Sequence, residues 1–229
     1  MRPNIKISGI FSADDAKMAL ELGADYISFD HISFSKRFLD FSQISAILDT
    51  LSAAQKRKVV LATDMSGVDS LSQFLKKSEI RIIEPVRPAM KNSDIMKIRK
   101  SGIKIFHKVS LNSSADILNI DLPKDAYDLA IFDIRPNFIS RVDRFTRNYK
   151  VARIVRDIFN DIKDNIPITE YGISGELNLD SIFTLIQVCQ PDLIDLSIQF
   201  EKEHSFYKSF DKMSSFFGKL NTVFPNVKN

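Results

Sequence analysis

Polar and ionisable side chains come directly after a series of short apolar segments along this chain. They include carboxylates, histidines, hydroxyls and a lysine, groups that carry general acid–base chemistry: Ser8, Asp30, His31, Asp64, Glu84, His107, Lys108, Asp133, Glu170, Tyr171, Asp195 and Ser197. Two interpretations are open for each of them. Either the group works in an active site, or it forms a structural ion pair with a cation such as Lys36, Arg37, Arg87 or Lys108.

The apolar segments alternate with amphipathic ones from one end of the chain to the other. Strands are predicted at residues 4–8, 25–29, 58–62, 80–84, 103–109, 129–133, 166–171 and 192–197. Helices are predicted at residues 12–22, 41–54, 68–77, 92–101, 113–119, 149–163, 178–188 and 203–220. This strict alternation predicts an α/β fold, a closed (β/α)8 TIM barrel that forms a single domain over residues 1–229, with an open doubly wound sheet as the alternative. A barrel would bring the strand-end groups together at one mouth.

Composition narrows the class of protein. The 229 residues include 32 Lys and Arg against 29 Asp and Glu, so the net charge of +3 lacks the basic excess typical of nucleic-acid binders. The single cysteine, Cys189, excludes an intrachain disulfide framework. No apolar run approaches the ~18 residues of a membrane span, and the first residues lack the apolar core of a signal peptide. We therefore expect a cytoplasmic protein that binds neither nucleic acid nor membrane.

Several segments resemble a known enzyme family. Residues 6–10 (KISGI) are similar to the K-[IV]-C-G-[IL] opening of phosphoribosylanthranilate isomerase, and residues 22–29 (LGADYISF) to its second strand. Residues 35–38 (SKRF) resemble its S-x-R loop. Matches to a later strand, at residues 131–133 (IFD), and to two later turns, at residues 173–178 (ISGELN) and 195–197 (DLS), follow in the same order. The resemblance spans the whole chain, is densest over residues 5–39, and implies the barrel fold.

The resemblance also implies an Amadori rearrangement, which opens a phosphorylated aldose amine and converts it into a 1-amino ketose. The general acid would be Asp133 at the end of the sixth strand, and Arg37 would contact the substrate. Ser8 stands where the family has its cysteine base, and a serine hydroxyl is a far weaker base than a thiolate. A carboxylate from a neighbouring strand could act instead, with Asp30, Asp64 and Glu84 as candidates.

The phosphate site implied by the resemblance lies after the last two strands. We expect Gly175, Ser174 and Ser197 to contribute to it, although Ser174, Glu176 and Gln199 replace the family's pattern and only one glycine remains. A basic segment follows Asp133. Two interpretations of it are open: Arg135, Arg141 or Arg144 clamps an anionic substrate, or the segment is a solvated surface.

The resemblance thus implies an isomerase of tryptophan biosynthesis that takes a sugar-phosphate substrate and uses neither metal nor cofactor. The alternative is a family member that has lost catalysis or binds another small anion or a protein partner. We expect a monomer or homodimer. Four aromatic residues near helical spacing, Phe206, Phe210, Phe216 and Phe217, are predicted to form the core-facing side of the last helix, with a dimer surface as the alternative.

Overall fold

A computed structural model describes residues 1–64, 67–86, 91–112, 116, 127–135, 153, 156–157, 160, 170–175 and 177–225. Eight parallel strands form a closed barrel in sequence order, β1 through β8, in which β1 also pairs with β8. The strands are Asn4–Ile7, Tyr26–His31, Val59–Thr63, Ile82–Pro85, Lys104–Leu111, Leu129–Ile134, Tyr171–Gly175 and Leu193–Leu196. The predicted (β/α)8 TIM barrel is therefore confirmed, and the open sheet is excluded.

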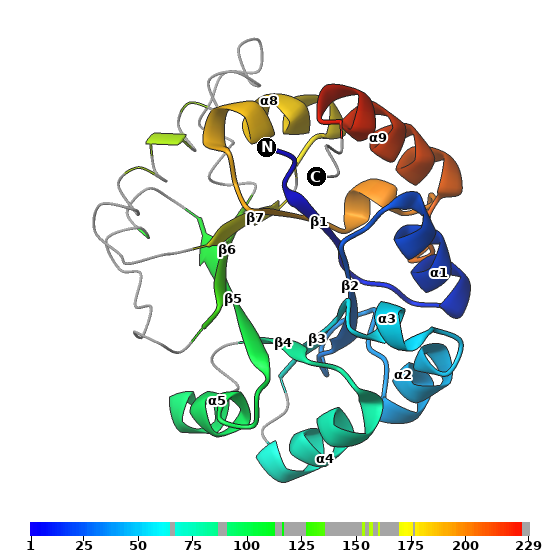
Figure 1. Ribbon diagram of the computed structural model, residues 1–229, viewed down its shortest axis with the longest axis vertical. Helices are drawn as coiled ribbons and strands as arrows, with labels where there is room; N and C mark the ends of the chain where they lie inside the picture. The colour runs from blue at the N-terminus through cyan, green and yellow to red at the C-terminus, as the bar shows by residue number, and fades with distance from the viewer. Residues whose placement is uncertain are drawn as a thin grey trace.

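Helices surround this ring of strands (Figure 1). They are α1 (Ala13–Leu22), α2 (Phe41–Leu48), α3 (Ala53–Lys56), α4 (Val68–Ser78), α5 (Asn92–Arg99), α8 (Leu179–Cys189) and α9 (Phe210–Val223), with a 3-10 turn, η3, at Ile198–Phe200. In the described part of the chain, no helix combines the length and apolar character needed to cross a membrane. Most of each of the helices predicted at 113–119 and 149–163 lies outside the described residues.

Local signals in the sequence explain where the helices begin and end. The Ser12 hydroxyl accepts a hydrogen bond from the Asp15 amide at the start of α1, and Gly23 ends the helix with a φ of 111°. The helix predicted at 41–54 stops earlier, at Leu48, because Ser52 and Gln55 form a capping box that starts α3. The final helix was predicted from residue 203 but begins at Phe210, where the Ser209 hydroxyl caps the Lys212 amide.

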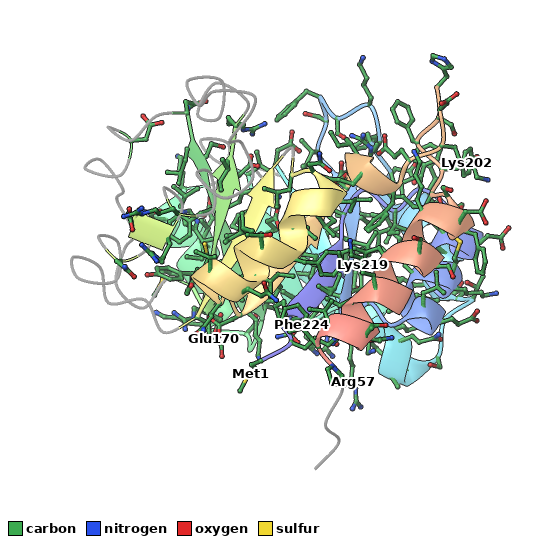
Figure 2. All side chains as sticks on the ribbon, turned by 90° about the horizontal axis from the view of Figure 1, so that it is seen from above. Met1, Arg57, Glu170, Lys202, Lys219 and Phe224 are labelled. Atoms are coloured by element: carbon green, nitrogen blue, oxygen red, sulfur yellow. The ribbon has the colours of Figure 1, made fainter. Side chains whose placement is uncertain are left out.

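The seventh strand was predicted at 166–171 and instead runs over Tyr171–Gly175. Its two glycines lower strand propensity and mislead a sequence-based assignment. The barrel needs Gly175, because its φ is 127° and a Cβ there would lie 2.2 Å from the Ile134 carbonyl oxygen on β6, whereas Gly172 packs closely against the Leu193 side chain on β8. Glu170 therefore precedes the strand and lies at the end of the barrel near Met1, away from Lys202 (Figure 2). The prediction that Glu170 and Tyr171 stand at the mouth was wrong.

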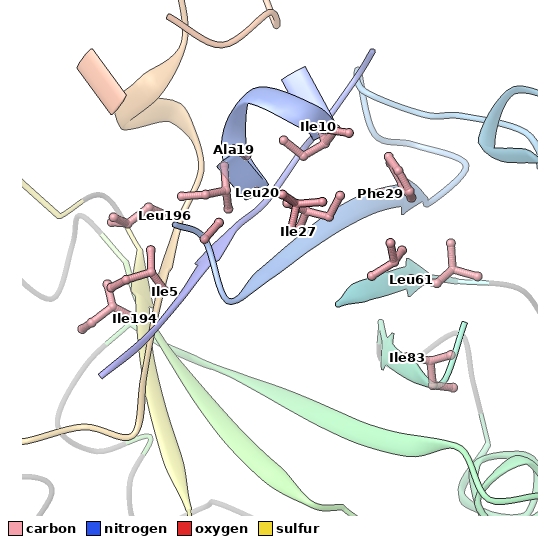
Figure 3. Packing of buried hydrophobic residues seen from close by; sticks show 14 of the residues in the cluster. Ile5, Ile10, Ala19, Leu20, Ile27, Phe29, Leu61, Ile83, Ile194 and Leu196 are labelled. Atoms are coloured by element: carbon pink, nitrogen blue, oxygen red, sulfur yellow. The ribbon is translucent and has the colours of Figure 1, made fainter. Parts of the chain in front are cut away.

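Alternation along the strands divides the apolar residues into two groups. Outward-facing side chains such as Ile5, Ile27 and Ile194 belong, together with Ala19 and Leu20 of α1, to the large core between strands and helices (Figure 3). A second, smaller cluster alternates with the first along the strands and so fills the barrel interior: Val60, Ile82, Phe106, Leu129, Ile131 and Leu193. Polar side chains follow it toward the carboxyl ends of the strands, and these build the site.

Candidate active site

A cavity of about 780 Å³ opens at the carboxyl ends of the strands. Each predicted site residue lines it: Ser8, Arg37, Asp133, Arg135, Ser174, Gly175 and Ser197. They come from five different strands or the loops that follow them, so only the closed barrel brings them together. Asp30, Glu84, Lys108 and Asp195 line the same cavity. This is the place and the mixture of groups that an active site in this fold requires.

A network of buried charges forms the floor of the cavity on one side. Lys6 of β1 donates to Glu84 of β4 at 2.7 Å and to Asp195 of β8 at 3.0 Å. Lys108 of β5 pairs with the same two carboxylates, each at 2.9 Å. Lys6, Glu84 and Asp195 have side chains that are 1–5% exposed, so the network is held in a medium of low dielectric constant. The interpretation that some mouth carboxylates form structural ion pairs holds for Glu84 and Asp195.

The network fixes the protonation of its own members. Burial alone would raise the pKa of Asp195, but Lys108, Lys6 and the Ser8 hydrogen bond together hold it well below its usual range. Glu84 follows the same balance, with a lowered pKa because the two lysines outweigh burial. Burial would lower the pKa of Lys108, yet Asp195 and Glu84 raise it. The carboxylates stay ionised and are weak bases.

Ser8 lies at the edge of this network. Its hydroxyl donates to Asp195 Oδ1 at 2.5 Å and accepts from Lys6 Nζ at 2.7 Å. A base that could activate the hydroxyl is therefore in contact with it, but that base is the carboxylate whose pKa is lowered. The structure thus gives Ser8 a fixed position and a weak proton acceptor.

Asp133 stands on β6, in a different environment. Its side chain is 10% exposed and pairs through Oδ2 with Arg135, at 2.8 Å, whose own side chain is 52% exposed. The Ser174 hydroxyl of β7 donates to Oδ1 at 3.2 Å. Arg135 also donates to the Ser110 hydroxyl at 3.3 Å and so lies over the cavity rim. Arg141 and Arg144 of the basic segment lie outside the described residues.

Arg37 bends across the turn that follows β1. Its Nε and Nη2 atoms lie 2.7 and 2.6 Å from Glu201 Oε1, and its guanidinium lies 5.1 Å from the centre of the Phe206 ring. Gly9 makes room for it, because a Cβ there would lie 2.7 Å from Arg37 Cδ. Phe206 thus supports Arg37 and is not part of α9, contrary to the prediction. Phe210 opens α9 but is 57% exposed, so its predicted core position was wrong, while Phe216 and Phe217 are buried as predicted.

The turn after β8, where the resemblance implies a phosphate site, is bridged by a glutamine. Gln199 accepts from the Ser197 amide at 2.9 Å and donates to the carbonyls of Gly175 and Leu177 at 2.9 and 3.1 Å. Gly175 has a φ of 127°, and a Cβ there would lie 2.2 Å from the Ile134 carbonyl oxygen. Glu176 lies outside the described residues.

The remaining candidates have different surroundings. Asp30 projects into the cavity from β2, whereas Asp64 accepts from the amide and hydroxyl of Ser33 and does not line the cavity. His31 points outward, stacks on Phe41 and contacts the Leu39 carbonyl, which is a structural role. Within the described ranges, no group of three or more His, Cys, Asp or Glu side chains is arranged to hold a metal ion.

Two lysines in these networks were not identified from the sequence as functional candidates. Lys6 lies between Ile5 and Ile7, and this alternation is the signal that its side chain faces the barrel interior. Lys208, fully buried, donates to the Ser197 carbonyl at 3.1 Å and to Glu201 at 3.4 Å. It lies in the turn before α9 that was predicted as helix, and so its inward position had no sequence signal.

Comparison with known proteins agrees with the resemblance noted from the sequence. No family model matches the chain. An N-(5'-phosphoribosyl)anthranilate isomerase from Parvibaculum lavamentivorans is 22% identical over 205 residues, which cover 88% of this chain and 91% of that protein. The chloroplastic N-(5'-phosphoribosyl)anthranilate isomerase 1 of Arabidopsis thaliana is 23% identical over 97% of this chain and 76% of its own length.

Solved structures of the same enzyme share the fold. The isomerase from Pyrococcus furiosus superimposes with a TM-score of 0.69 at 17% identity, covering 96% of this chain and 99% of that one. The isomerase from Thermotoga maritima gives a TM-score of 0.70 at 17% identity, with coverage of 96% and 99%. Sequence similarity over nearly the whole length, together with the closed barrel, identifies the chain as a divergent relative of the phosphoribosylanthranilate isomerases.

Proposed function

We propose that this chain catalyses the Amadori rearrangement of N-(5'-phosphoribosyl)anthranilate to the corresponding 1-amino ketose, carboxyphenylamino-deoxyribulose phosphate. The observation that carries the proposal is Asp133, a carboxyl from β6 that lines one cavity together with Ser8 from β1, in a chain similar to these isomerases over most of its length. The finer expectations belong to the same proposal: a cytoplasmic, single-domain enzyme of tryptophan biosynthesis that works as a monomer or homodimer.

The first chemical step needs a proton donor. Asp133 protonates the furanose ring oxygen, the bond from that oxygen to C1 breaks, and the nitrogen lone pair forms the C1=N bond of a cationic Schiff base. Ser174 already donates to Oδ1, so the proton leaves from Oδ2. That oxygen pairs with Arg135, and the ion pair has to open when substrate arrives. Arg135 is half-exposed and can then turn to an anionic group of the substrate.

The second step moves a proton off C2. The C–H electron pair forms the C1=C2 bond, and the C=N pair returns to nitrogen. The enol O–H proton passes to the Asp133 carboxylate left by the first step, which restores the acid, and protonation of C1 gives the ketone. Only protons move, and reactant and product are isomers, so the reaction has no need of a redox partner. This step needs a base to accept the C2 proton, and the Ser8 hydroxyl is too weak a base to do so.

Two regions are placed to hold the substrate's negative charges. Arg37 contributes a guanidinium at the cavity wall, where Glu201 now holds it. Ser174, Gly175 and Ser197 line the wall by β7 and β8, where a phosphate would bind. The Ser197 amide becomes available to a phosphate oxygen when Gln199 releases it.

The test is the loss of phosphoribosylanthranilate fluorescence in the presence of pure protein. We expect turnover by the wild type and a loss of about 10²–10⁴-fold in kcat for Asp133→Asn. Circular dichroism would establish that this variant is folded. Silence in both the wild type and Ser8→Cys would overturn the proposal. The alternative, a protein that binds a different small anion or a partner, would then gain support from Gln199 and Glu201, which occupy the expected anion contacts.

A further inference from the structure

The proposed reaction needs a base, and the carboxylates of the buried network are poorly suited to that role. Both oxygens of Asp195 are engaged, Oδ1 by Ser8 and Oδ2 by Lys6 and Lys108. Both oxygens of Glu84 are engaged by the same lysines. A carboxylate that takes a proton here would lose two ion pairs in a buried setting, which is costly. The base must come from elsewhere on the cavity wall.

Asp30 is the carboxylate of the described wall that neither the network nor the acid step uses. It lines the cavity, and its Oδ2 accepts from the Ser35 hydroxyl at 2.9 Å. Among the residues that the structure describes, no lysine or arginine lies within 4.0 Å of its carboxylate oxygens. Unlike Glu84 and Asp195, it can take up a proton without breaking an ion pair to a described residue.

The strand register places Asp30 close to Ser8 but nearer the open end of the barrel. In the pairing of β1 with β2, Ile7 lies opposite Ile27, so Ser8 lies level with Ser28. Asp30 is two residues farther along β2 and faces the same side of the strand as Ser28, which also lines the cavity. Two residues of strand correspond to about 6.6 Å. Asp30 therefore stands in the next layer above Ser8, where a bound sugar would lie on top of the charged floor.

We propose that Asp30 is the general base that takes the C2 proton of the open-chain Schiff base, in place of the thiol that Ser8 lacks. The inference rests on the proposed function and adds a catalytic residue to it. In the step, an Asp30 oxygen forms a bond to the C2 hydrogen while the C–H pair becomes the C1=C2 bond. The same carboxyl group can return this proton to C1, which is bonded to C2, and is then ready for the next turnover.

The electrostatic surroundings of Asp30 agree with this role. Burial raises its pKa, with the like charge of Glu84 adding to the effect; the Ser35 hydrogen bond, Lys108 and Lys6 act in the opposite direction. The other charged groups lining the cavity are Arg37 from the loop after β2, Asp133 and Arg135 from β6 and its loop, and Asp195 from β8. A carboxylate with a raised pKa is a stronger base than Asp195 or Glu84, whose pKa values are lowered.

Asp30→Asn tests the inference with little change in shape, because the amide oxygen can still accept from Ser35. We expect kcat to fall by about 10²–10⁴-fold. Binding of reduced 1-(o-carboxyphenylamino)-1-deoxyribulose 5-phosphate, the ligand found in a solved isomerase structure, should stay within a few-fold of wild type. Asp64→Asn is the matched comparison, since it removes a carboxylate after the next strand that does not line the cavity. We expect it to retain turnover.

A thiol at Ser8 should bypass the missing base. Ser8→Cys combined with Asp30→Asn should recover part of the turnover, with the rising limb of the pH profile moved toward the thiol range near pH 8.5. The wild type should rise at a lower pH, because its base is a carboxylate.

The outcomes separate the inference from the proposed function. Undiminished turnover in Asp30→Asn would overturn the inference alone, as would a loss that follows Asp64→Asn instead. A wild type that is inactive until Ser8→Cys is introduced would also overturn it. A wild type that neither turns over nor binds the reduced analogue would overturn the proposed function, and the inference with it.

Discussion

The two sides of the cavity hold their carboxylates in opposite ways. Along β1, β4, β5 and β8, Glu84 and Asp195 are locked between Lys6 and Lys108, with distances of 2.7–3.0 Å. Along β6 and β7, Asp133 has one ion pair, to a half-exposed arginine. The first arrangement fixes charge where water is excluded, whereas the second leaves a carboxyl whose partner can move.

This difference distinguishes carboxylates that are held ionised by the fold from carboxylates that can exchange protons. A buried carboxylate with two cations is held ionised and makes a weak base, however close it lies to the substrate. A carboxylate with a single mobile partner can exchange protons. The proposed proton transfers therefore fall to Asp133 and Asp30, which lie outside the lysine network, while Lys6 and Lys108 hold Glu84 and Asp195 in place.

The largest expected effect is a loss of stability when one lysine of the buried network is removed. Lys6→Met leaves two buried carboxylates with Lys108 as their only remaining described cation, and breaking a buried pair costs about 3–5 kcal/mol of unfolding free energy. Arg135→Met is the matched variant on the other side and should cost less than about 1 kcal/mol, because Arg135 is half-exposed. Denaturant unfolding of both variants measures the contrast. Equal losses would show that the two sides are held alike.

Acid should destabilise the barrel through the carboxylates of the lysine network. Glu84 and Asp195 have lowered pKa values in the folded protein, so their contribution to stability is fully present above about pH 4, the ordinary range of such carboxyls, and is lost as the pH falls through the lowered values. The raised pKa values of Asp30 and Asp15 act in the opposite sense, since protonation relieves their burial. Unfolding free energy measured between neutral pH and pH 2 should fall, and Glu84→Gln should flatten the slope. An unchanged slope in that variant would exclude Glu84 as a cause.

Much of this architecture follows from local sequence. The Ser12 cap and the Gly23 stop predict the bounds of a helix, and the alternation of apolar with amphipathic segments predicts the barrel. The residues at the ends of the predicted strands then include many of those that line the cavity. The network of buried charges at the floor of the cavity cannot be predicted in the same way. Lys6 can be assigned to the interior from alternation alone, but its partners Glu84 and Asp195 are 78 and 189 residues away, and only barrel closure brings them together.

The wrong predictions for the position of β7 and for the start of α9 have physical causes as well. Gly172 and Gly175 lower the strand propensity of β7, while close packing on β8 favours a glycine at 172 and the backbone of β6 requires one at 175. Residues 203–209 look helical by pattern, but Lys208 is drawn inward by Ser197 and Glu201, and the helix cannot start until Ser209 caps it. In both cases tertiary contacts outweigh local preference.

On the side of β6 and β7, backbone geometry should matter more than charge. Gly175→Ala places a methyl group 2.2 Å from the Ile134 carbonyl oxygen at a φ of 127°, so β6 has to shift, and with it Asp133. A strained backbone position of this kind costs on the order of 1–3 kcal/mol. Gly218→Ala, within α9 and with nothing within 4 Å, should instead stabilise by up to ~1 kcal/mol. Thermal unfolding distinguishes the two, and a Gly175→Ala variant as stable as Gly218→Ala would contradict the strain.

The smallest effect concerns Glu201, which holds Arg37 away from an incoming anion. Glu201→Gln removes the competing charge and frees the guanidinium, while the buried Lys208, whose pKa burial lowers, keeps its contact with the Ser197 carbonyl. A partly exposed pair is worth about 1 kcal/mol, so the affinity for the reduced product analogue should rise roughly fivefold. Titration calorimetry measures this, and the Arg37→Gln, Glu201→Gln double variant should show no gain. A weaker affinity in the single variant would mean that Glu201 positions Arg37 for the substrate, and that the ion pair belongs to the structural side of the cavity.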